Sequence, residues 1–241
     1  MKLARMSDGR PEIFHTLQGE GRNLGRPSVF IRASLCNLHC HWCDTPYTWN
    51  WKGSNFDHER EQKFQRDEEI IDLSTEAIIE EVSRFPCRNF VLTGGEPLLQ
   101  ERGWLDLMER LDGHYEIETN GTVFPGEEFL ERLDQINVSP KLSNSGIDES
   151  KRRKPDVLCQ FVRTEKADFK FVVGNETDLA EVLALVAEAD LPADRVFLMP
   201  KASSVAELET RQEMVSAWAL ENKFRYSDRL HLRLYGAKRG V

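Results

Sequence analysis

The sequence predicts an α/β fold with about six or seven mostly parallel strands, and three observations lead to it. From about residue 28 onward, short runs rich in β-branched and aromatic residues alternate with stretches of helical periodicity. Strands separated by helices pair in parallel through right-handed crossovers. The 241 residues, 40% of them hydrophobic, can bury one sizeable core and contain no internal repeat, low-complexity tract or linker. These features predict a single domain over residues 1–241, built as an open doubly wound sheet or as a partial barrel.

The individual elements are predicted from local patterns. The first strand of the series, 28–33, leads directly into a cluster of cysteines, and the polar segment 44–72 that follows has no clear period. Ser74 is a candidate N-cap for a helix over 74–85 whose apolar residues fall on one face. The remaining strands are predicted at 89–93, 115–119, 135–139, 168–173, 195–199 and 230–235. The remaining helices are predicted at 98–111, 127–133, about 179–186 and 205–220.

Composition argues against several classes of partner. The 32 Lys and Arg against 41 Asp and Glu leave a net charge of −9, and an acidic surface repels the phosphates of nucleic acids. No apolar run is long enough to cross a membrane, and the first residues contain no apolar signal region. The sequence therefore predicts a cytoplasmic protein that binds neither nucleic acid nor membrane.

The cysteines indicate a metal site. The chain contains five, namely Cys36, Cys40, Cys43, Cys87 and Cys159. An odd number with three in eight residues makes a poor disulfide framework but suits a metal site in a reducing compartment. The C-x3-C-x2-C spacing fits structural zinc with His39 or His41 as fourth ligand. It also fits an iron–sulfur cluster that keeps one iron open, which the spacing favours over zinc without excluding zinc.

Polar side chains gather where the predicted strands end. Arg32, Thr93, Glu118 and Ser139 all lie at or near the carboxyl end of a predicted strand. In β/α folds of either kind, this edge is where binding and catalytic groups collect. We therefore expect these residues to share one rim with the cysteine loop. Lys170 lies in the middle of a strand, and alternation alone does not assign its side chain to a face.

A turn after the second predicted strand extends the cysteine pattern. It reads Gly94-Gly95-Glu96-Pro97, and its glycines let the backbone approach a ligand closely. Together with the cysteine loop, in which Trp42 precedes the third cysteine, it resembles the radical S-adenosylmethionine (SAM) superfamily. The resemblance implies a [4Fe–4S] cluster held by Cys36, Cys40 and Cys43, with SAM bound to the open iron. It also implies that the glycine turn contacts the methionyl amine of SAM.

Further motifs narrow the resemblance to one family. They are Thr16 to Gly21, Cys43-Asp44-Thr45, Thr93 to Pro97 and Ser139-Pro140-Lys141. In this combination, from residue 12 to His231, they resemble the 7-carboxy-7-deazaguanine synthase family. The resemblance implies an abridged β/α barrel, usually a homodimer, with a cluster loop over 36–45 and a lid-like insertion over about 46–72.

The implied reaction converts 6-carboxy-5,6,7,8-tetrahydropterin into 7-carboxy-7-deazaguanine. An adenosyl radical abstracts the hydrogen at C6, the ring contracts, ammonia leaves and SAM is regenerated. Magnesium assists, an external one-electron donor such as a flavodoxin supplies the electron, and the product feeds queuosine and other deazapurines. No side chain is assigned as catalytic, because the cluster and SAM carry the chemistry.

The resemblance also assigns roles to individual positions. It implies SAM contacts for Trp42, Asp44, Gly95, Glu96, Ser139, Pro140 and Lys141. It implies pterin contacts for Leu17, Gln18, Gly19, Glu20, Arg32, Thr93 and His231, and a magnesium ligand in Thr45. Glu20 can accept hydrogen bonds from the guanidine-like edge of the pterin, and the planar fork of Arg32 suits the substrate carboxylate. His231, on the predicted final strand, has a core or edge role as its alternative.

Two other functions share part of this pattern. A glycyl-radical activating enzyme has the same cysteine spacing and a similar length but acts on a protein. A zinc-stapled binding protein would use the cysteines without redox chemistry. The large aromatic residues Trp49 and Trp51 are expected to pack the insertion as a lid or a dimer contact.

Overall fold

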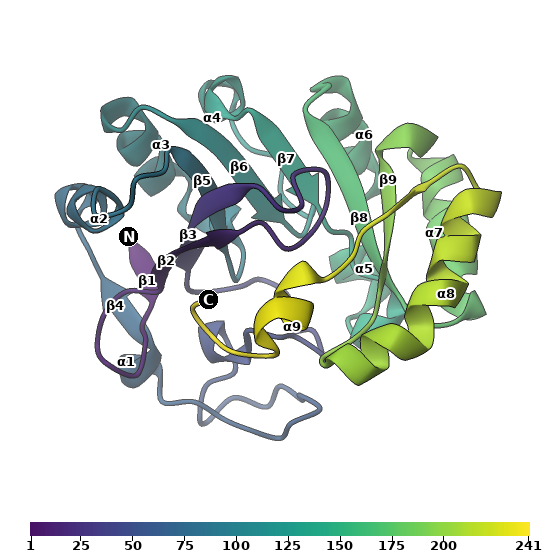
Figure 1. Cartoon of the computed structure of the whole chain (residues 1–241), viewed down its shortest axis with the longest axis horizontal. Coiled ribbons are helices and arrows are strands. Elements are labelled where there is room, and N and C mark those ends of the chain that lie inside the picture. Colours follow the sequence, from purple (N-terminus) through teal and green to yellow (C-terminus); the bar gives the residue numbers. More distant parts are fainter.

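Strands and helices alternate along the chain in the computed structural model, which describes residues 1–241 (Figure 1). The strands are β1 (Lys2–Ala4), β2 (Ile13–Leu17), β3 (Pro27–Ala33), β4 (Ile70–Asp72), β5 (Asn89–Gly94), β6 (His114–Thr119), β7 (Gln135–Val138), β8 (Ala167–Val173), β9 (Val196–Pro200) and β10 (Arg225–Tyr226). The α-helices are α1 (Arg66–Glu69), α2 (Thr75–Val82), α3 (Glu101–Arg110), α4 (Glu127–Arg132), α5 (Glu149–Arg152), α6 (Pro155–Arg163), α7 (Glu176–Glu188), α8 (Val205–Glu221) and α9 (Leu230–Tyr235). Short 3-10 helices are η1 (Pro46–Thr48), η2 (Pro97–Gln100), η3 (Ser143–Ser145) and η4 (Ala193–Arg195).

One sheet of ten strands organises the molecule. Its order is β10-β9-β8-β7-β6-β5-β3-β1-β4, and β2 pairs with β3 outside this path. The strands β3, β5, β6, β7, β8, β9 and β10 run parallel. The end strands β10 and β4 do not pair with each other, so the sheet curves without closing (Figure 1). The prediction of an abridged β/α barrel is therefore confirmed, as is the mostly parallel pairing.

Alternation along the parallel strands separates an apolar outer face from a polar interior. On β8, Phe169 and Phe171 belong to the core of 35 buried residues, whereas Lys170 between them lines the interior cavity. On β6, Ile117 is a core residue and Glu118 lines the cavity. Successive side chains of a strand point to opposite faces, so each strand contributes both to the core and to the site. The structure thus assigns Lys170 to the interior.

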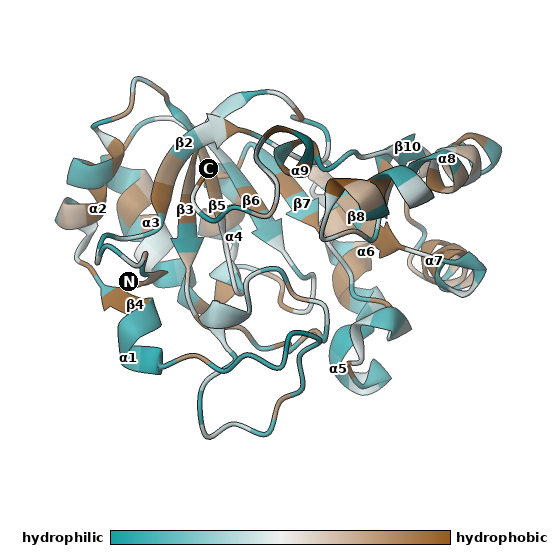
Figure 2. Cartoon of the chain, turned by 60° about the horizontal axis from the view of Figure 1, so that its bottom comes forward, coloured by the Kyte–Doolittle hydropathy of each residue, from teal (hydrophilic) through white to brown (hydrophobic).

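Hydrophobic residues concentrate in the strands and helices, whereas the loop that precedes α1 is mostly hydrophilic (Figure 2). Ser74 is the N-cap of α2, as predicted, and its hydroxyl accepts from the backbone nitrogen of Ala77 at 3.3 Å. No helix combines the length and the apolar composition that a membrane crossing requires.

The prediction of a final strand over 230–235 is wrong. These residues form α9, and the short β10 takes the last parallel position beside β9. The alternating Leu-His-Leu-Arg-Leu pattern is typical of a strand, but only Leu232 is fully buried, against Ala202 and Leu208. Leu234 is exposed. A single buried contact suits a short helix, which lies at the open side of the barrel (Figure 1).

The N-terminal residues and the insertion supply strands that were not predicted. The strand β1 pairs antiparallel with both β3 and β4, and β2 pairs antiparallel with β3. The insertion 46–72 begins with the buried side chains of Thr48, Trp49 and Asn50 and ends in β4, which joins the sheet. Much of its middle is exposed, and a lid role for this part stays a prediction.

Candidate functional site

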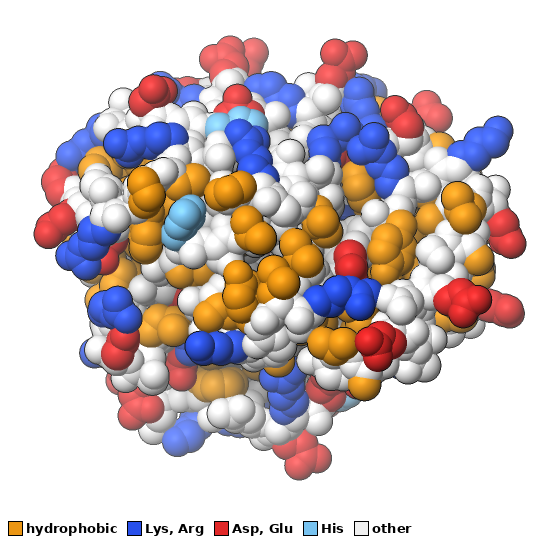
Figure 3. All heavy atoms as spheres, viewed as in Figure 1, with side chains coloured by type: hydrophobic (Ala, Val, Ile, Leu, Met, Phe, Trp, Pro, Cys, Tyr) orange, Lys and Arg blue, Asp and Glu red, His pale blue; other side chains and the backbone are white.

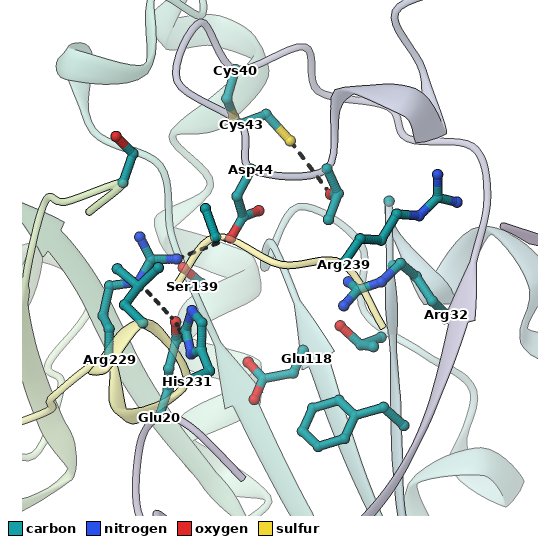
Figure 4. A pocket seen from close by; sticks show the side chains of 18 of the residues that line it. Glu20, Arg32, Cys40, Cys43, Asp44, Glu118, Ser139, Arg229, His231 and Arg239 are labelled. Carbon is teal, nitrogen blue, oxygen red and sulfur yellow. Dashed lines mark hydrogen bonds and ion pairs between the residues drawn. The ribbon is translucent and has the colours of Figure 1, made fainter. Parts of the chain in front are cut away.

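A cavity of about 330 Å³ lies at the carboxyl edge of the parallel strands (Figure 4). It is bounded by the cysteine loop, the turn after β2, α9 and the C-terminal residues 236–241. The predicted site residues that line it are Leu17, Gln18, Glu20, Arg32, Cys36, Cys40, Trp42, Cys43, Asp44, Thr45, Thr93, Gly95, Ser139, Lys141 and His231. The predicted residues Gly19, Glu96 and Pro140 do not line it.

The cysteine loop leaves β3 through a strained backbone position. Leu35 has a φ of +76°, which is uncommon for a residue with a side chain, and its backbone nitrogen donates to the carbonyl of Thr48 at 3.0 Å. The indole nitrogen of Trp49 donates to the sulfur of Cys43 at 3.4 Å, and the hydroxyl of Thr45 lies 3.6 Å from the same sulfur. Trp49 therefore packs against the cysteine loop and supports one candidate cluster ligand.

The three thiols fit a polynuclear cluster better than a single ion. Burial raises the pKa of Cys36, Cys40 and Cys43, that of Cys40 to about 12, so the thiols need a bound metal to lose their protons. No three acidic, His or Cys side chains meet closely enough to hold one metal ion. A [4Fe–4S] cluster binds its thiolates to different irons and so keeps them farther apart than a tetrahedral zinc site does. Three thiols around an open cavity suit a cluster with one iron left free.

The glycine turn is shaped by the neighbouring chain. Gly94 has a φ of +132°, and a Cβ atom there would lie 2.0 Å from the carbonyl oxygen of Ala33. A Cβ atom on Gly95 would lie 2.0 Å from the carbonyl oxygen of Leu35. The close approach that requires these glycines is therefore made by the strand end that enters the cysteine loop. It fixes the turn directly beside the candidate cluster ligands.

The side chain of Glu96 is committed inside the protein. Its fully buried carboxylate accepts from the backbone nitrogens of Leu98 at 3.1 Å and Asn120 at 2.8 Å, and from the hydroxyl of Thr119 at 2.8 Å. Burial raises its pKa despite these bonds. Glu96 thus ties the glycine turn to the end of β6, and a contact of its side chain with SAM stays a prediction.

Trp42 forms a fixed aromatic wall. Its indole nitrogen donates to the amide oxygen of Asn144 at 3.1 Å. The ammonium groups of Lys141 and Lys201 lie 5.7 Å and 5.9 Å from its ring centre, within cation–π range. Lys141 also donates to the hydroxyl of Ser139 at 3.0 Å. The predicted SAM contacts Trp42, Ser139 and Lys141 thus form one group, to which the structure adds Lys201.

A buried ion cluster forms the floor of the cavity. The ammonium of Lys170, whose side chain is 5% exposed, lies 2.6 Å from a carboxylate oxygen of Glu20 and 3.0 Å from one of Glu118. Burial opposes charge on Glu20, but Lys170 and Arg229 hold its pKa well below its usual range. Burial raises the pKa of Glu118 from 4.5 to about 7. Near neutral pH the carboxylate of Glu20 is therefore ionised, whereas that of Glu118 is partly protonated.

A polar layer beneath this floor closes the lower part of the barrel. The amide nitrogen of Gln18 donates to Glu116 at 2.6 Å. Two nitrogens of Arg22 donate to the two carboxylate oxygens of Asp168, each at 2.6 Å. These bonds fix the turn that carries Glu20 to strands β6 and β8, so its carboxylate is held in place before any ligand binds.

Arg32 lies across the cavity from Glu20 and His231 (Figure 4). Its Nε donates to the buried carboxylate of Glu12 at 2.7 Å, which leaves its two terminal nitrogens for a ligand. Glu12 also accepts from the hydroxyl of Tyr47 at 3.0 Å and from Nε of Arg239 at 2.7 Å. The two ends of the cavity therefore differ, with a guanidinium fork at one and carboxylates at the other.

The helix α9 brings His231 to the cavity. The backbone nitrogen of Leu230 donates to the carbonyl of Gly19 at 2.9 Å, and the backbone nitrogen of Gly21 donates to the hydroxyl of Ser227 at 2.8 Å. A Cβ atom on Gly19 would lie 2.5 Å from the imidazole of His231, so only glycine admits the ring. Burial lowers the pKa of His231. His231 thus lines the cavity although its element was predicted wrongly, and its contact with the pterin stays a prediction.

Several charged residues of the site were not predicted from the sequence. Glu12, Arg229 and Arg239 line the cavity, and Lys201 lies against the ring of Trp42. No local motif contains them, because each finds its partner across the barrel. Only Glu12 lies close in the sequence to a predicted motif, the turn Thr16 to Gly21.

Comparison with known proteins matches most of the chain to one group. Residues 31–203 match the Radical SAM superfamily. The chain is 36% identical over 233 residues to the 7-carboxy-7-deazaguanine synthase of Pyrobaculum aerophilum, with 95% of each chain covered. It is 35% identical over 246 residues to the synthase of Rhodopirellula baltica, covering 95% of this chain and 87% of that protein. The crystal structure of QueE from Escherichia coli matches with a TM-score of 0.66 and 26% identity, covering 96% of this chain and 95% of that one.

Proposed function

Because the chain belongs to the 7-carboxy-7-deazaguanine synthase family of the radical SAM superfamily, and is therefore a radical SAM lyase, we propose that it converts 6-carboxy-5,6,7,8-tetrahydropterin into 7-carboxy-7-deazaguanine. The reaction comprises hydrogen abstraction at C6, ring contraction and loss of ammonia. Substrate and product differ by one ammonia, so no net oxidant or reductant is consumed. Neither a glycyl-radical activating enzyme nor a zinc-stapled binding protein is supported by these relatives.

Superfamily membership implies a [4Fe–4S] cluster and SAM. Cys36, Cys40 and Cys43 would hold the cluster, and the wall of Trp42, Asp44, Gly95, Ser139 and Lys141, with Glu96 and Pro140 beside it, would hold SAM. When bound, these groups supply the radical chemistry that removes a hydrogen atom from C6 of the pterin and later returns one. The chain's own task is to orient the ligands and to exclude water from the cavity.

The observation that carries the substrate proposal is the contrast between the two ends of the cavity. At one end, the terminal nitrogens of Arg32 can bind a carboxylate in two parallel hydrogen bonds. At the other end, Glu20 uses one lone pair on each oxygen for Lys170 and Arg229 and retains one on each for the guanidine-like edge of a pterin. A carboxylated pterin carries both groups on one rigid ring. Leu17, Gln18, Gly19, Thr93 and His231 would complete its contacts.

A magnesium ion is proposed beside the cluster loop. The hydroxyl of Thr45 lies in the cavity wall, and a hydroxyl oxygen is a hard donor of the kind that Mg²⁺ accepts. The ion would join Thr45 to the substrate carboxylate and keep waters as its other ligands. A loss of Mg²⁺ stimulation in Thr45→Ala but not in Thr45→Ser supports this role, and equal stimulation of both variants contradicts it.

The remaining partners are proposed on the family relationship. We propose a cytoplasmic homodimer that receives electrons from an external one-electron donor such as a flavodoxin. Leu234 and Tyr235 of α9 are 49% and 42% exposed. Hydrophobic side chains gather across the middle of the face that Figure 3 shows, which is the view in which Figure 1 shows α9. Light scattering on the purified protein tests the dimer, since a monomeric mass at micromolar concentration contradicts it.

An anaerobic product assay with two variants tests the function. The reconstituted protein is incubated with SAM, a one-electron reductant and carboxytetrahydropterin, and wild type is expected to form the ring-contracted product. Cys40→Ala is expected to form no product and to leave SAM intact, because a candidate cluster ligand is lost. Arg32→Ala is expected to keep the cluster but lose about 100-fold in kcat/KM, the effect of one charge-assisted pair. Cleavage of SAM by wild type without product contradicts the proposal.

A further inference from the structure

Arg229 connects two parts of the cavity that the proposed function assigns to different ligands. It lies directly before α9, and its side chain is 11% exposed. Its Nε donates to Glu20 at 3.1 Å, and its Nη2 donates to Asp44 at 2.9 Å (Figure 4). Its Nη1 donates to the carbonyl of Ala202. One guanidinium thus joins the pterin turn, the cluster loop and the segment after β9.

The two links of Arg229 differ in how firmly their partners are held. Glu20 is 17% exposed and is also paired with Lys170. Asp44 is 63% exposed, and Arg229 is the one side chain that binds its carboxylate. The position of the Asp44 carboxylate therefore depends on Arg229, and Arg229 in turn is oriented by Glu20. The planar fork of arginine makes this double contact, and a single ammonium does not reproduce it.

A guanidinium that is held in place lowers the entropy loss for ordering the Asp44 carboxylate. A pterin that binds Glu20 also holds the guanidinium of Arg229, and through it the exposed carboxylate of Asp44. SAM then meets a side chain that is already ordered, so less conformational entropy is lost when it binds. Coupling of this kind is reciprocal, since each ligand must strengthen the other by the same factor.

We propose that Arg229 is a positioning residue that couples the binding of SAM at Asp44 to the binding of the pterin at Glu20. The proposal rests on the proposed function, which places SAM beside Asp44 and the pterin beside Glu20. Its consequence is positive cooperativity between the two ligands. The ternary complex is favoured over the complex with SAM alone, which limits SAM cleavage in the absence of substrate.

The test is a binding measurement on the reconstituted holoenzyme without reductant, so that no turnover occurs. The Kd of radiolabelled SAM is measured by equilibrium dialysis with and without saturating carboxytetrahydropterin. Wild type is expected to bind SAM at least about 5-fold more tightly with the pterin present, the lower end of usual coupling factors. The reciprocal experiment, on pterin binding with and without SAM, is expected to give the same factor.

Arg229→Lys keeps the charge and removes the fork, and its coupling factor is expected to fall to within about 2-fold of unity. Arg233→Lys, four residues further along in α9, is the matched control. Arg233 binds Asp228 and Gln212, lies outside the cavity, and is expected to leave the factor unchanged. Asp44→Asn changes an exposed side chain and provides a second variant if Arg229→Lys does not fold. It is expected to lower the factor as well.

Two results overturn the coupling. One is a wild-type factor of unity, and the other is a wild-type factor retained in both Arg229→Lys and Asp44→Asn. The product assay separates these from a failure of the proposed function. Absence of product from wild type refutes the function, whereas normal product with unchanged coupling in the variants refutes the role of Arg229 alone.

Discussion

Replacing Glu12 by glutamine removes one buried charge from between two guanidinium groups. The Glu12 carboxylate is 1% exposed and accepts from Nε of Arg32 and Nε of Arg239, each at 2.7 Å, and from the hydroxyl of Tyr47 at 3.0 Å. Glutamine has nearly the same shape, but its amide nitrogen is a donor. In Glu12→Gln that nitrogen must face a second donor, and both cations lose the negative charge of Glu12.

The expected loss of stability follows from these contacts. Removing one partner of a buried ion pair costs about 3–5 kcal/mol. Arg239 keeps its ion pair with Glu69 at 2.9 Å, and Arg32 faces the cavity, where water can reach it. The lower end, about 3 kcal/mol, is therefore expected. At about 2–4 °C per kcal/mol for a chain of this size, Tm falls by about 6–12 °C.

Anaerobic thermal and urea unfolding measure this loss. Glu80→Gln is the matched control, because Glu80 forms an exposed pair with Arg84 at 3.8 Å and is expected to change stability by less than about 0.5 kcal/mol. In the double variant Glu12→Gln/Arg239→Gln, one of the two cations that faced Glu12 is also removed. Its destabilisation is expected to fall short of the sum of the single changes by about 1 kcal/mol or more. A loss below about 1 kcal/mol in Glu12→Gln, or strict additivity in the double variant, contradicts the assignment.

Three further changes have expected outcomes. Gly95→Ala places a Cβ atom 2.0 Å from a backbone oxygen and is expected to prevent retention of the cluster, measured as bound iron. The control Gly174→Ala, whose Cβ atom would have its nearest contact at 3.5 Å, is expected to retain the cluster. Equal iron content in the two variants contradicts this. Glu118 has its pKa raised from 4.5 to about 7, so the folded chain keeps a proton that the unfolded chain has lost, and its contribution to stability falls as pH rises through this window. Glu118→Gln is expected to remove that slope from unfolding curves recorded at several pH values, and an unchanged slope refutes the assignment. Trp49→Phe removes the hydrogen bond to the Cys43 sulfur and is expected to make the cluster potential more negative in an anaerobic redox titration; an unchanged potential argues against this contact.

The parts of the site that could be predicted lie close together in the sequence. Cys36, Cys40 and Cys43 fall within eight residues, and the turn after Thr93 is four residues long. Their spacing requires no knowledge of the fold. The alternation of strands and helices is also local, which is why the parallel sheet was predicted although its short strands β1, β4 and β10 were not.

The parts that could not be predicted depend on long-range pairing. Arg229 binds Glu20 across 209 positions, and Arg239 binds Glu12 across 227. In the sequence, such residues look like ordinary surface charges. The helix α9 was read as a strand for a related reason. Its short alternating pattern fits both elements, and its position at the open side of the barrel decides between them.

The direct test of the proposed reaction is the fate of the hydrogen at C6. Carboxytetrahydropterin deuterated at C6 is incubated anaerobically with the reconstituted protein, unlabelled SAM and reductant, and SAM, product and ammonia are quantified by mass spectrometry and enzymatic assay. Abstraction at C6 with regeneration predicts product and ammonia in equal amounts, with deuterium appearing in recovered SAM. Product without deuterium in SAM, or SAM converted to 5′-deoxyadenosine without product, contradicts it.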